Sequence, residues 1–192
     1  MLLRLMNKAL TTLLPFSWVL FFLILPCRAW AWAGRVVDVA AGEIITVLKN
    51  GESVDVLLYG IDCPEKGQSF SDQAKQFTSK MVFDKVVEVY RMDTDRQGRT
   101  IALVAVDKSL LNEELVKAGL AWVSSRYCYE VICETWKYYQ LRAKIGKRGL
   151  WSDPNPISPW EFRKKNKNNA VWHYDTDVAP LQSVAPPRRS SQ

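Results

Sequence analysis

After residue 34, the chain carries short runs in which apolar and polar residues alternate, and many of the apolar residues are β-branched. Alternation with a period of two is typical of strands that bury one face. The pattern predicts five strands, at residues 35–40, 44–49, 53–59, 86–92 and 100–106. Asn50-Gly51 lies between the second and third runs, where this dipeptide favours a tight hairpin turn.

Three other segments have the apolar spacing of helices. The first lies between the third and fourth strands, and Ser69 or Ser71 is its expected N-cap. A second helix is predicted at 110–118 and ends at Gly119, and a third at 131–146. The apolar stripes of the first and third helices are Phe70, Ala74, Phe77, Met81 and Ile132, Trp136, Tyr139, Ala143.

The predicted order of elements is therefore β-β-β-α-β-β-α-α. Five short strands with one helix between the third and fourth are the layout of an OB-fold barrel. We expect an α+β domain at residues 34–163, with a five-stranded barrel and three helices. Prolines after Trp151 predict an extended strap, and the polar composition of residues 164–192 predicts a disordered tail.

The first 33 residues have the composition of a targeting segment. Arg4 and Lys8 precede an uncharged run at 9–25, and Ala31-Trp32-Ala33 follows it. This predicts a signal peptide cut before Gly34, with an uncleaved membrane anchor through residues 9–25 as the alternative. Either leaves the domain outside the cytosol: secreted, periplasmic or membrane-anchored. Because residues 1–33 contain three basic residues and no acidic one, their removal lowers the net charge from +6 to +3. That balance permits a polyanionic partner without arguing for one.

The cysteines and the histidine of the chain limit the kinds of catalytic and metal site that the domain can form. Cys128 and Cys133 are five residues apart and are expected to form a disulfide rather than a metal pair, which leaves Cys63 unpaired. The only histidine, His173, lies in the predicted tail. The domain therefore has no imidazole for acid–base catalysis and no His/Cys zinc cluster. A metal site would be built from oxygen, which suits Ca²⁺ or Mg²⁺.

Two polar segments are candidates for chemistry. Residues 60–65, Gly-Ile-Asp-Cys-Pro-Glu, place two carboxylates at a strand end. Asp62 could ligate a metal ion and Glu65 could hold or deprotonate a water molecule. Residues 93–100 join the last two strands, and Arg99 begins the second of them, so a rigid element would aim its guanidinium at a phosphate. Each segment alone also fits a solvated turn.

Together, these segments resemble the staphylococcal nuclease (thermonuclease) family. Residues 60–68 are similar to the family's metal loop and residues 93–99 to its second motif. Residues 112–121 and 149–151 are similar to its helix and its closing signature, and the order and spacing match over residues 35–163. The resemblance implies an OB-fold and a Ca²⁺-dependent phosphodiesterase that acts on DNA and RNA.

The resemblance also implies a role for individual residues. Asp62 matches a metal ligand, and Cys63 matches a residue that binds the metal ion through its backbone carbonyl. Glu65 matches the residue that positions or activates the attacking water, and Arg99 matches a phosphate-binding arginine.

Two positions depart from the family's pattern. The motif Asp-Gly-Asp-Thr is replaced by residues 41–44, Ala-Gly-Glu-Ile, so the metal ligand is Glu43 and its carboxylate is displaced by about 1.5 Å, one bond length. The first catalytic arginine is replaced by Leu57, and Asp55 on the same strand face would repel phosphate. Lys66 is a candidate substitute. Because such an arginine contributes about 10³–10⁵ in rate, we expect a weakened nuclease.

A catalytically inactive OB-fold module that binds nucleic acid or protein is the alternative. Glu43 and Leu57 favour that alternative, whereas the retained Asp62, Glu65 and Arg99 favour the enzyme.

The expected partner is DNA or RNA, preferably single-stranded, and the chain is expected to be a monomer. Some aromatic and basic residues are candidates for contact with this partner. Tyr127 and Tyr129 are candidates for stacking on bases, with simple packing as the alternative. The basic residues 163–165 are expected to be a solvated part of the tail, with nucleic acid or lipid head groups as alternative contacts.

Overall fold

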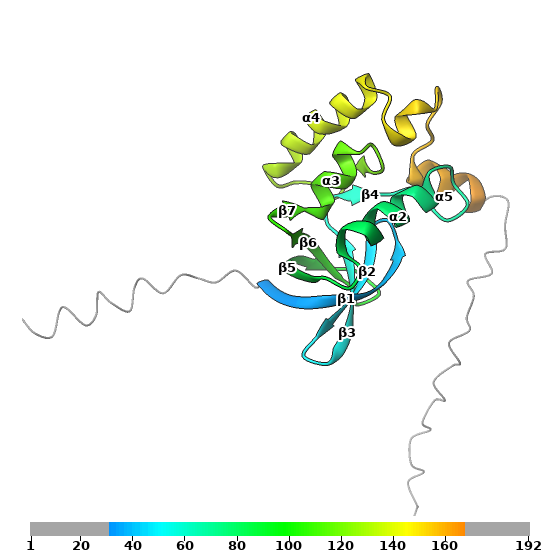
Figure 1. Cartoon of the computed structure of the whole chain (residues 1–192). Coiled ribbons are helices and arrows are strands. Elements are labelled where there is room, and N and C mark those ends of the chain that lie inside the picture. The colour runs from blue at the N-terminus through cyan, green and yellow to red at the C-terminus, as the bar shows by residue number, and fades with distance from the viewer. Residues whose placement is uncertain (1–30, 168–192) are drawn as a thin grey trace, which may run out of the picture.

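The computed structural model describes residues 31–167, and its centre is a closed β-barrel (Figure 1). The strand order is β3-β2-β1-β5-β6-β7, and an additional parallel pairing of β3 with β6 closes the sheet on itself. This confirms the predicted OB-fold barrel. The strands are β1 (Ala31–Ala41), β2 (Ile44–Lys49), β3 (Glu52–Leu58), β5 (Val86–Thr94), β6 (Thr100–Val106) and the two-residue β7 (Ser109–Leu110).

The first strand starts earlier than the expected domain boundary. Ala31, Trp32 and Ala33 pair with β5, opposite Tyr90, Val89 and Glu88. A cut before Gly34 would remove these three strand residues. The rest of the predicted leader, including residues 9–25, and the tail from residue 168 with His173 lie outside the described residues. Within residues 31–167, no helix is long and apolar enough to cross a membrane.

The hairpin between β2 and β3 turns where the sequence predicts. Lys49 pairs with Glu52, so only Asn50 and Gly51 form the turn. Both have positive φ angles, 51° and 89°. Asn and Gly are the residues that adopt this left-handed conformation most readily, which explains why the dipeptide marks the turn.

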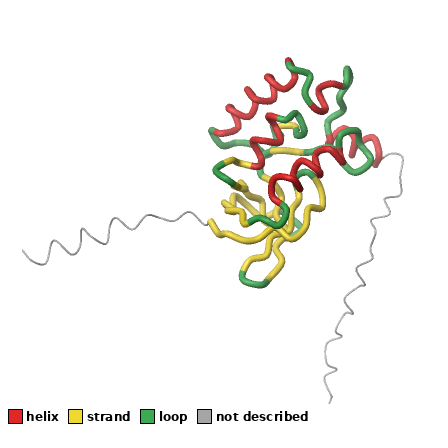
Figure 2. Tube along the Cα trace, viewed as in Figure 1, coloured by secondary structure: helices red, strands yellow, loops and turns green. Residues whose placement is uncertain are grey.

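The helices gather at one end of the barrel (Figure 2). They are α2 (Ser71–Val82), α3 (Leu111–Lys117), α4 (Ile132–Ile145), the 3₁₀ turn η1 (Gly149–Ser152) and α5 (Pro159–Lys167). A second small sheet, β4 (Ile61–Asp62) paired with β8 (Trp122–Val123), lies between the barrel and the helices. The first three helices match their predicted positions to within two residues. Trp136 and Ala143 on α4 are buried, as their stripe predicts.

Two local expectations were wrong. The N-cap of α2 is Phe70, with φ of 70° and no side-chain hydrogen bond, instead of Ser69 or Ser71. The chain after Pro159 forms α5 where a strap and tail were expected. Ser158 and Glu161 explain this helix, because the Ser158 hydroxyl and backbone N–H both donate to the Glu161 carboxylate, at 2.6 and 3.2 Å. Ser158-x-x-Glu161 has the sequence of a capping box and makes one of its two bonds, from the Ser158 N–H to the Glu161 side chain, and proline follows at the first helical position.

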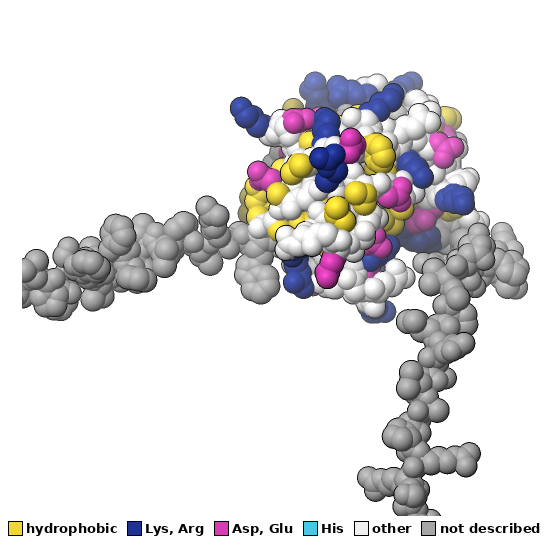
Figure 3. Space-filling view, turned by 60° about the horizontal axis from the view of Figure 1, so that its bottom comes forward, with side chains coloured by type: hydrophobic (Ala, Val, Ile, Leu, Met, Phe, Trp, Pro, Cys, Tyr) yellow, Lys and Arg dark blue, Asp and Glu magenta, His cyan; other side chains and the backbone are white. Residues whose placement is uncertain are grey.

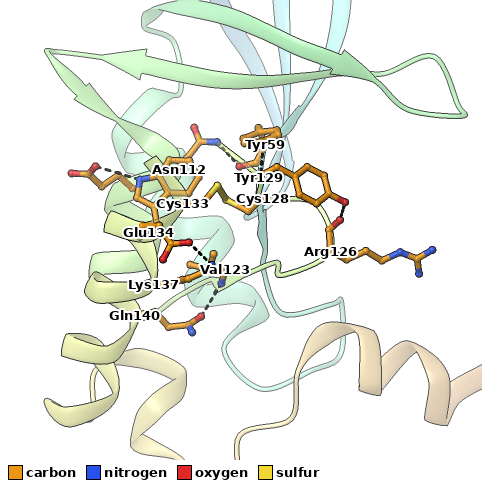
Figure 4. Close-up of a disulfide and its surroundings, with 12 residues drawn as sticks. Tyr59, Asn112, Val123, Arg126, Cys128, Tyr129, Cys133, Glu134, Lys137 and Gln140 are labelled. Atoms are coloured by element: carbon orange, nitrogen blue, oxygen red, sulfur yellow. Dashed lines mark hydrogen bonds and ion pairs between the residues drawn. A yellow bond between two sulfur atoms is a disulfide. The ribbon is translucent and has the colours of Figure 1, made fainter. Parts of the chain in front are cut away.

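A disulfide joins Cys128 to Cys133, with Cα atoms 5.7 Å apart (Figure 4). It closes the loop after β8 onto the start of α4. In this loop, the backbone N–H of Tyr129 donates to the Tyr59 hydroxyl at 2.9 Å. A Cβ atom on Gly60 would lie only 2.6 Å from Cys128 Sγ, so the close approach requires glycine at this position. The disulfide therefore closes the loop covalently, and a hydrogen bond and close packing hold the loop against the end of β3.

Candidate functional site

Three carboxylates gather near the small second sheet. Glu43 lies in the turn between β1 and β2, Asp62 ends β4, and Glu65 follows in the next loop. The charges of Asp62 and Glu65 both help to raise the pKa of Glu43, which places the three groups within electrostatic reach of one another. The structure therefore brings together the three acids that the sequence singled out.

Glu43 is the most unusual of the three. Its side chain is buried, with the residue only 8% exposed, and its Oε2 atom has no hydrogen-bond partner among the described residues. Burial first, and then the charge of Asp62, raises the pKa of Glu43 to about 8. Burying a carboxylate with an unpaired oxygen costs free energy unless a proton or a cation satisfies it.

The turn that carries Glu43 is fixed from two sides. The Leu58 backbone N–H donates to the Glu43 carbonyl at 2.9 Å, and the Thr78 hydroxyl of α2 donates to the Gly42 carbonyl at 2.6 Å. A Cβ atom on Gly42 would lie 2.8 Å from Cys63 Sγ. Glycine thus lets the turn pack directly on the loop that carries Asp62.

Cys63 is fully buried behind this turn. Burial, followed by the charge of Glu43, raises the pKa of the Cys63 thiol well above its usual range. A neutral buried thiol is inert. The structure therefore does not favour the Cys63 sulfur as a nucleophile.

Arg163 is the residue of the site that sequence reasoning missed. From α5, its Nη2 donates to Asp62 Oδ2 at 2.8 Å and its Nη1 to Asp62 Oδ1 at 3.2 Å, while Nη1 also bonds the Glu65 carboxylate. Burial raises the pKa of Asp62, and the hydrogen bonds from Arg163 offset only part of that rise. The signal that would have found Arg163 is the capping pattern Ser158-x-x-Glu161, which predicts a helix where a tail was expected.

Arg99 is the last residue of the β5–β6 loop, because β6 begins at Thr100 and not at Arg99 as expected. Its Nε donates to Asp95 Oδ2 at 2.7 Å and its backbone N–H to Asp95 Oδ1 at 2.9 Å. Its side chain is 27% exposed. Leu57 pairs in register with Ile101, and both line the larger cavity described below.

Neither Asp55 nor Lys66 compensates for the arginine that Leu57 replaces. Asp55 accepts a hydrogen bond from the Thr46 hydroxyl at 2.8 Å and remains exposed. Lys66 is exposed in the loop after Glu65, and it lines neither of the two cavities described below.

Two open cavities meet beside the site. One, of about 890 Å³, is lined by Leu57, Tyr59, the β5–β6 loop and the loop after β8. The other, of about 540 Å³, lies between that loop and α5 and includes Asp62 and Arg163. Arg126 and Tyr127 line both cavities, so they form the ridge between them.

The two tyrosines considered for base stacking are surface residues. Tyr127 is 59% exposed and Tyr129 is 76% exposed, and both line the larger cavity. Core packing is therefore excluded for them. On the face shown in Figure 3, basic and acidic side chains are interspersed.

The acids near the small second sheet supply carboxylate oxygens, which Ca²⁺ and Mg²⁺ both accept as ligands. Carboxylate and carbonyl oxygens are the ligands that Ca²⁺ takes, and the unpartnered Glu43 oxygen is one that a cation would satisfy. Within residues 31–167, however, no group of three or more His, Cys, Asp or Glu side chains is arranged to hold a metal ion. Arg163 engages two of the three carboxylates instead.

Comparison with known proteins identifies the family. Residues 55–153 match the profile described as "Staphylococcal nuclease homologue". An "Uncharacterized endonuclease" of Haemophilus influenzae is 36% identical over 159 residues, which cover 82% of this chain and 88% of that protein. A "Micrococcal nuclease" of Shigella flexneri is 34% identical over 156 residues, covering 76% and 89%. "Protein ParB" of Escherichia coli is 37% identical over 158 residues, covering 76% and 88%.

These matches confirm the resemblance read from residues 60–68, 93–99 and 149–151, and they support a nuclease function. With the barrel, the acidic loop and the relatives in agreement, the chain belongs to the staphylococcal nuclease family.

Proposed function

We propose that this chain is an exported Ca²⁺-dependent endonuclease that hydrolyses phosphodiester bonds of DNA or RNA. The observation that carries the proposal is the buried Glu43 carboxylate, with an unpartnered oxygen, next to Asp62 and Glu65. A nucleic-acid substrate is supported by family membership.

Each candidate site residue would have its own role in the proposed reaction. Glu43, Asp62 and the Cys63 carbonyl would hold Ca²⁺, which supplies Lewis-acid polarisation of the phosphate when bound. Glu65 would hold and deprotonate the attacking water. Arg99, released from Asp95, would bind the phosphate oxygens as charge develops on them. Because Leu57 offers no second guanidinium, the reaction is expected to be slow.

The test is cleavage of single-stranded DNA by the purified protein in Ca²⁺, with and without a chelator. We expect weak cleavage that the chelator abolishes and that Glu65→Ala removes. Leu57→Arg is expected to raise the rate at least about 10-fold, because it restores a phosphate-binding guanidinium beside the larger cavity. Leu57→Lys is the matched control, since it restores charge without the fork. Cleavage that persists in the chelator would contradict the proposal.

An inactive binding module is favoured by one specific observation. Arg163 engages both Asp62 and Glu65 and would compete with a metal ion for them. If this contact closes the site, the wild-type protein should neither cut DNA nor show a Ca²⁺-induced rise in Tm. Arg163→Ala would then recover the rise in Tm, which distinguishes a blocked site from one that lacks its ligands.

The location outside the cytosol is also proposed. It is supported by the disulfide between Cys128 and Cys133, because disulfides persist mainly in oxidising compartments. Fractionation of cells that express the chain would test it, and recovery of the protein only from the cytosol would contradict it.

A further inference from the structure

The cavity between α5 and the loop after β8 has no role in the reaction described above. Its volume, about 540 Å³, lies within the range of small-ligand sites. One wall is Ser124, Ser125 and Arg126, and the other is formed by Arg163 and Lys164 of α5. Asp62 lines it as well, so the cavity opens directly beside the carboxylates.

The charge inside this cavity is positive. Asp62 is the only acid among its lining residues, and Arg163 already pairs with it. Within the described part of the chain, neither Arg126 nor Lys164 forms an ion pair with a carboxylate. Two unpaired cations with serine hydroxyls beside them are the chemistry of a phosphate site.

Arg126 is presented by a rigid loop. The Ser124 carbonyl accepts hydrogen bonds from the backbone N–H groups of Tyr127, at 3.2 Å, and Cys128, at 3.0 Å. The disulfide closes the same loop, and the Arg126 guanidinium lies 5.4 Å from the centre of the Tyr127 ring. A cation held in this way loses little entropy when an anion binds.

The position of the ridge indicates what the ligand is. Arg126 and Tyr127 line both cavities, so a ligand that fills one can continue over the ridge into the other. A strand with regularly spaced phosphates fits such a path, whereas a single nucleotide would occupy one side only. The family match ends at residue 153, before α5, so the second cavity lies partly outside the matched region.

We propose that this cavity is a second phosphate-binding subsite, in which Arg126 and Lys164 hold a phosphate of a nucleic-acid strand that crosses the Arg126–Tyr127 ridge. This inference rests on the proposed function for its choice of ligand. It makes polymers that span both cavities the preferred substrate and leaves mononucleotides poorly bound.

The experiment measures binding without turnover. A fluorescent single-stranded 12-mer is titrated with the full chain in chelator, at several salt concentrations, by anisotropy. Arg126→Ala and Lys164→Ala should each raise Kd about 10-fold, the loss expected for one charge-assisted contact. Each should also lower the salt slope by about 0.7, the value for one phosphate contact on a single strand. A dinucleotide should show no such change.

Lys165→Ala is the matched control, because Lys165 follows Lys164 on α5 but does not line this cavity. Equal losses for all three variants would show diffuse attraction and overturn the subsite, as would no loss at all. Selective loss of binding to vesicles with anionic lipid, with the 12-mer unaffected, would also overturn it. If both variants weaken binding of the 12-mer but the protein never cleaves DNA, the proposed nuclease activity is wrong and the subsite stands. If the protein cleaves DNA and both variants bind the 12-mer normally, the subsite is wrong and the nuclease activity stands.

Discussion

At the scale of single residues, the site is governed by how buried charges are satisfied. Asp62 and Glu65 both form ion pairs with one arginine, but Glu43 has no such partner among the described residues. An unpaired buried carboxylate is most easily satisfied by a proton in the absence of metal. Glu43 therefore links the stability of the protein to pH and to cations.

This link gives a prediction for the metal-free protein. The pKa of Glu43 is about 8 in the folded state against an ordinary value of 4.5, so the folded state binds more protons between these values. The free energy of unfolding should therefore fall as pH rises from about 4.5 to about 8, with no further loss from Glu43 above that range. Urea denaturation in chelator at several pH values measures this.

Glu43→Gln is the control for the pH prediction. Glutamine has the same size and cannot ionise, so the decline in stability over this range should become shallower in the variant. An identical pH dependence for wild type and variant would show that Glu43 is ionised normally.

At the scale of elements, α5 completes the site. Ser158 and Glu161 start the helix, and Gln68 ties the acidic loop to the preceding strap by donating to the Ile157 carbonyl at 2.5 Å. The Trp160 ring lies 5.5 Å from the Trp122 ring of β8. These contacts set the position from which Arg163 reaches the carboxylates.

Loss of the α5 cap should therefore loosen the site. Ser158→Ala removes the hydroxyl that bonds Glu161, and we expect a loss of about 1 kcal/mol in stability. Amide hydrogen exchange should accelerate in residues 159–167 while the barrel strands keep their protection. Ser152→Ala is a control, because that hydroxyl donates within η1, at 2.8 Å to the Gly149 carbonyl. Unchanged exchange in α5 would contradict the role of the cap.

At the scale of the whole molecule, barrel closure positions the site. The parallel pairing of β3 with β6 is short, three residue pairs, and Asn112 of α3 reinforces it. Its Oδ1 accepts from the Val104 N–H at 3.1 Å, and its Nδ2 donates to the carbonyls of Tyr59, at 3.0 Å, and Ala102, at 3.3 Å. One fully buried side chain thus connects a helix to both closing strands.

Removal of this connection should destabilise the entire fold. Asn112→Ala leaves buried backbone groups without partners, and we expect a loss of about 2–4 kcal/mol in the free energy of unfolding. Asn112→Asp should recover only part of it, because a carboxylate can accept from Val104 but cannot donate to the two carbonyls. Thermal unfolding followed by circular dichroism measures both variants. A loss of under about 1 kcal/mol for Asn112→Ala would contradict the role assigned to this residue.

The sequence by itself determined the barrel and the first three helices. These follow from short-range patterns: alternation in strands and apolar stripes in helices. Asn50-Gly51 shows why such signals are reliable, since the required backbone conformation is encoded in two adjacent residues. The grouping of Glu43 with Asp62 and Glu65 was implied by the family resemblance, because no short-range pattern links Glu43 to the loop of Asp62.

Only the tertiary structure decided what surrounds those acids. Arg163 is separated from Asp62 by 101 positions in the chain, and no local pattern encodes that ion pair. The same holds for the unpartnered Glu43 oxygen and for the ridge shared by the two cavities, because both depend on distant segments packing together. Burial and charge pairing are properties of the folded chain, so the state of the site becomes visible only after the fold has formed.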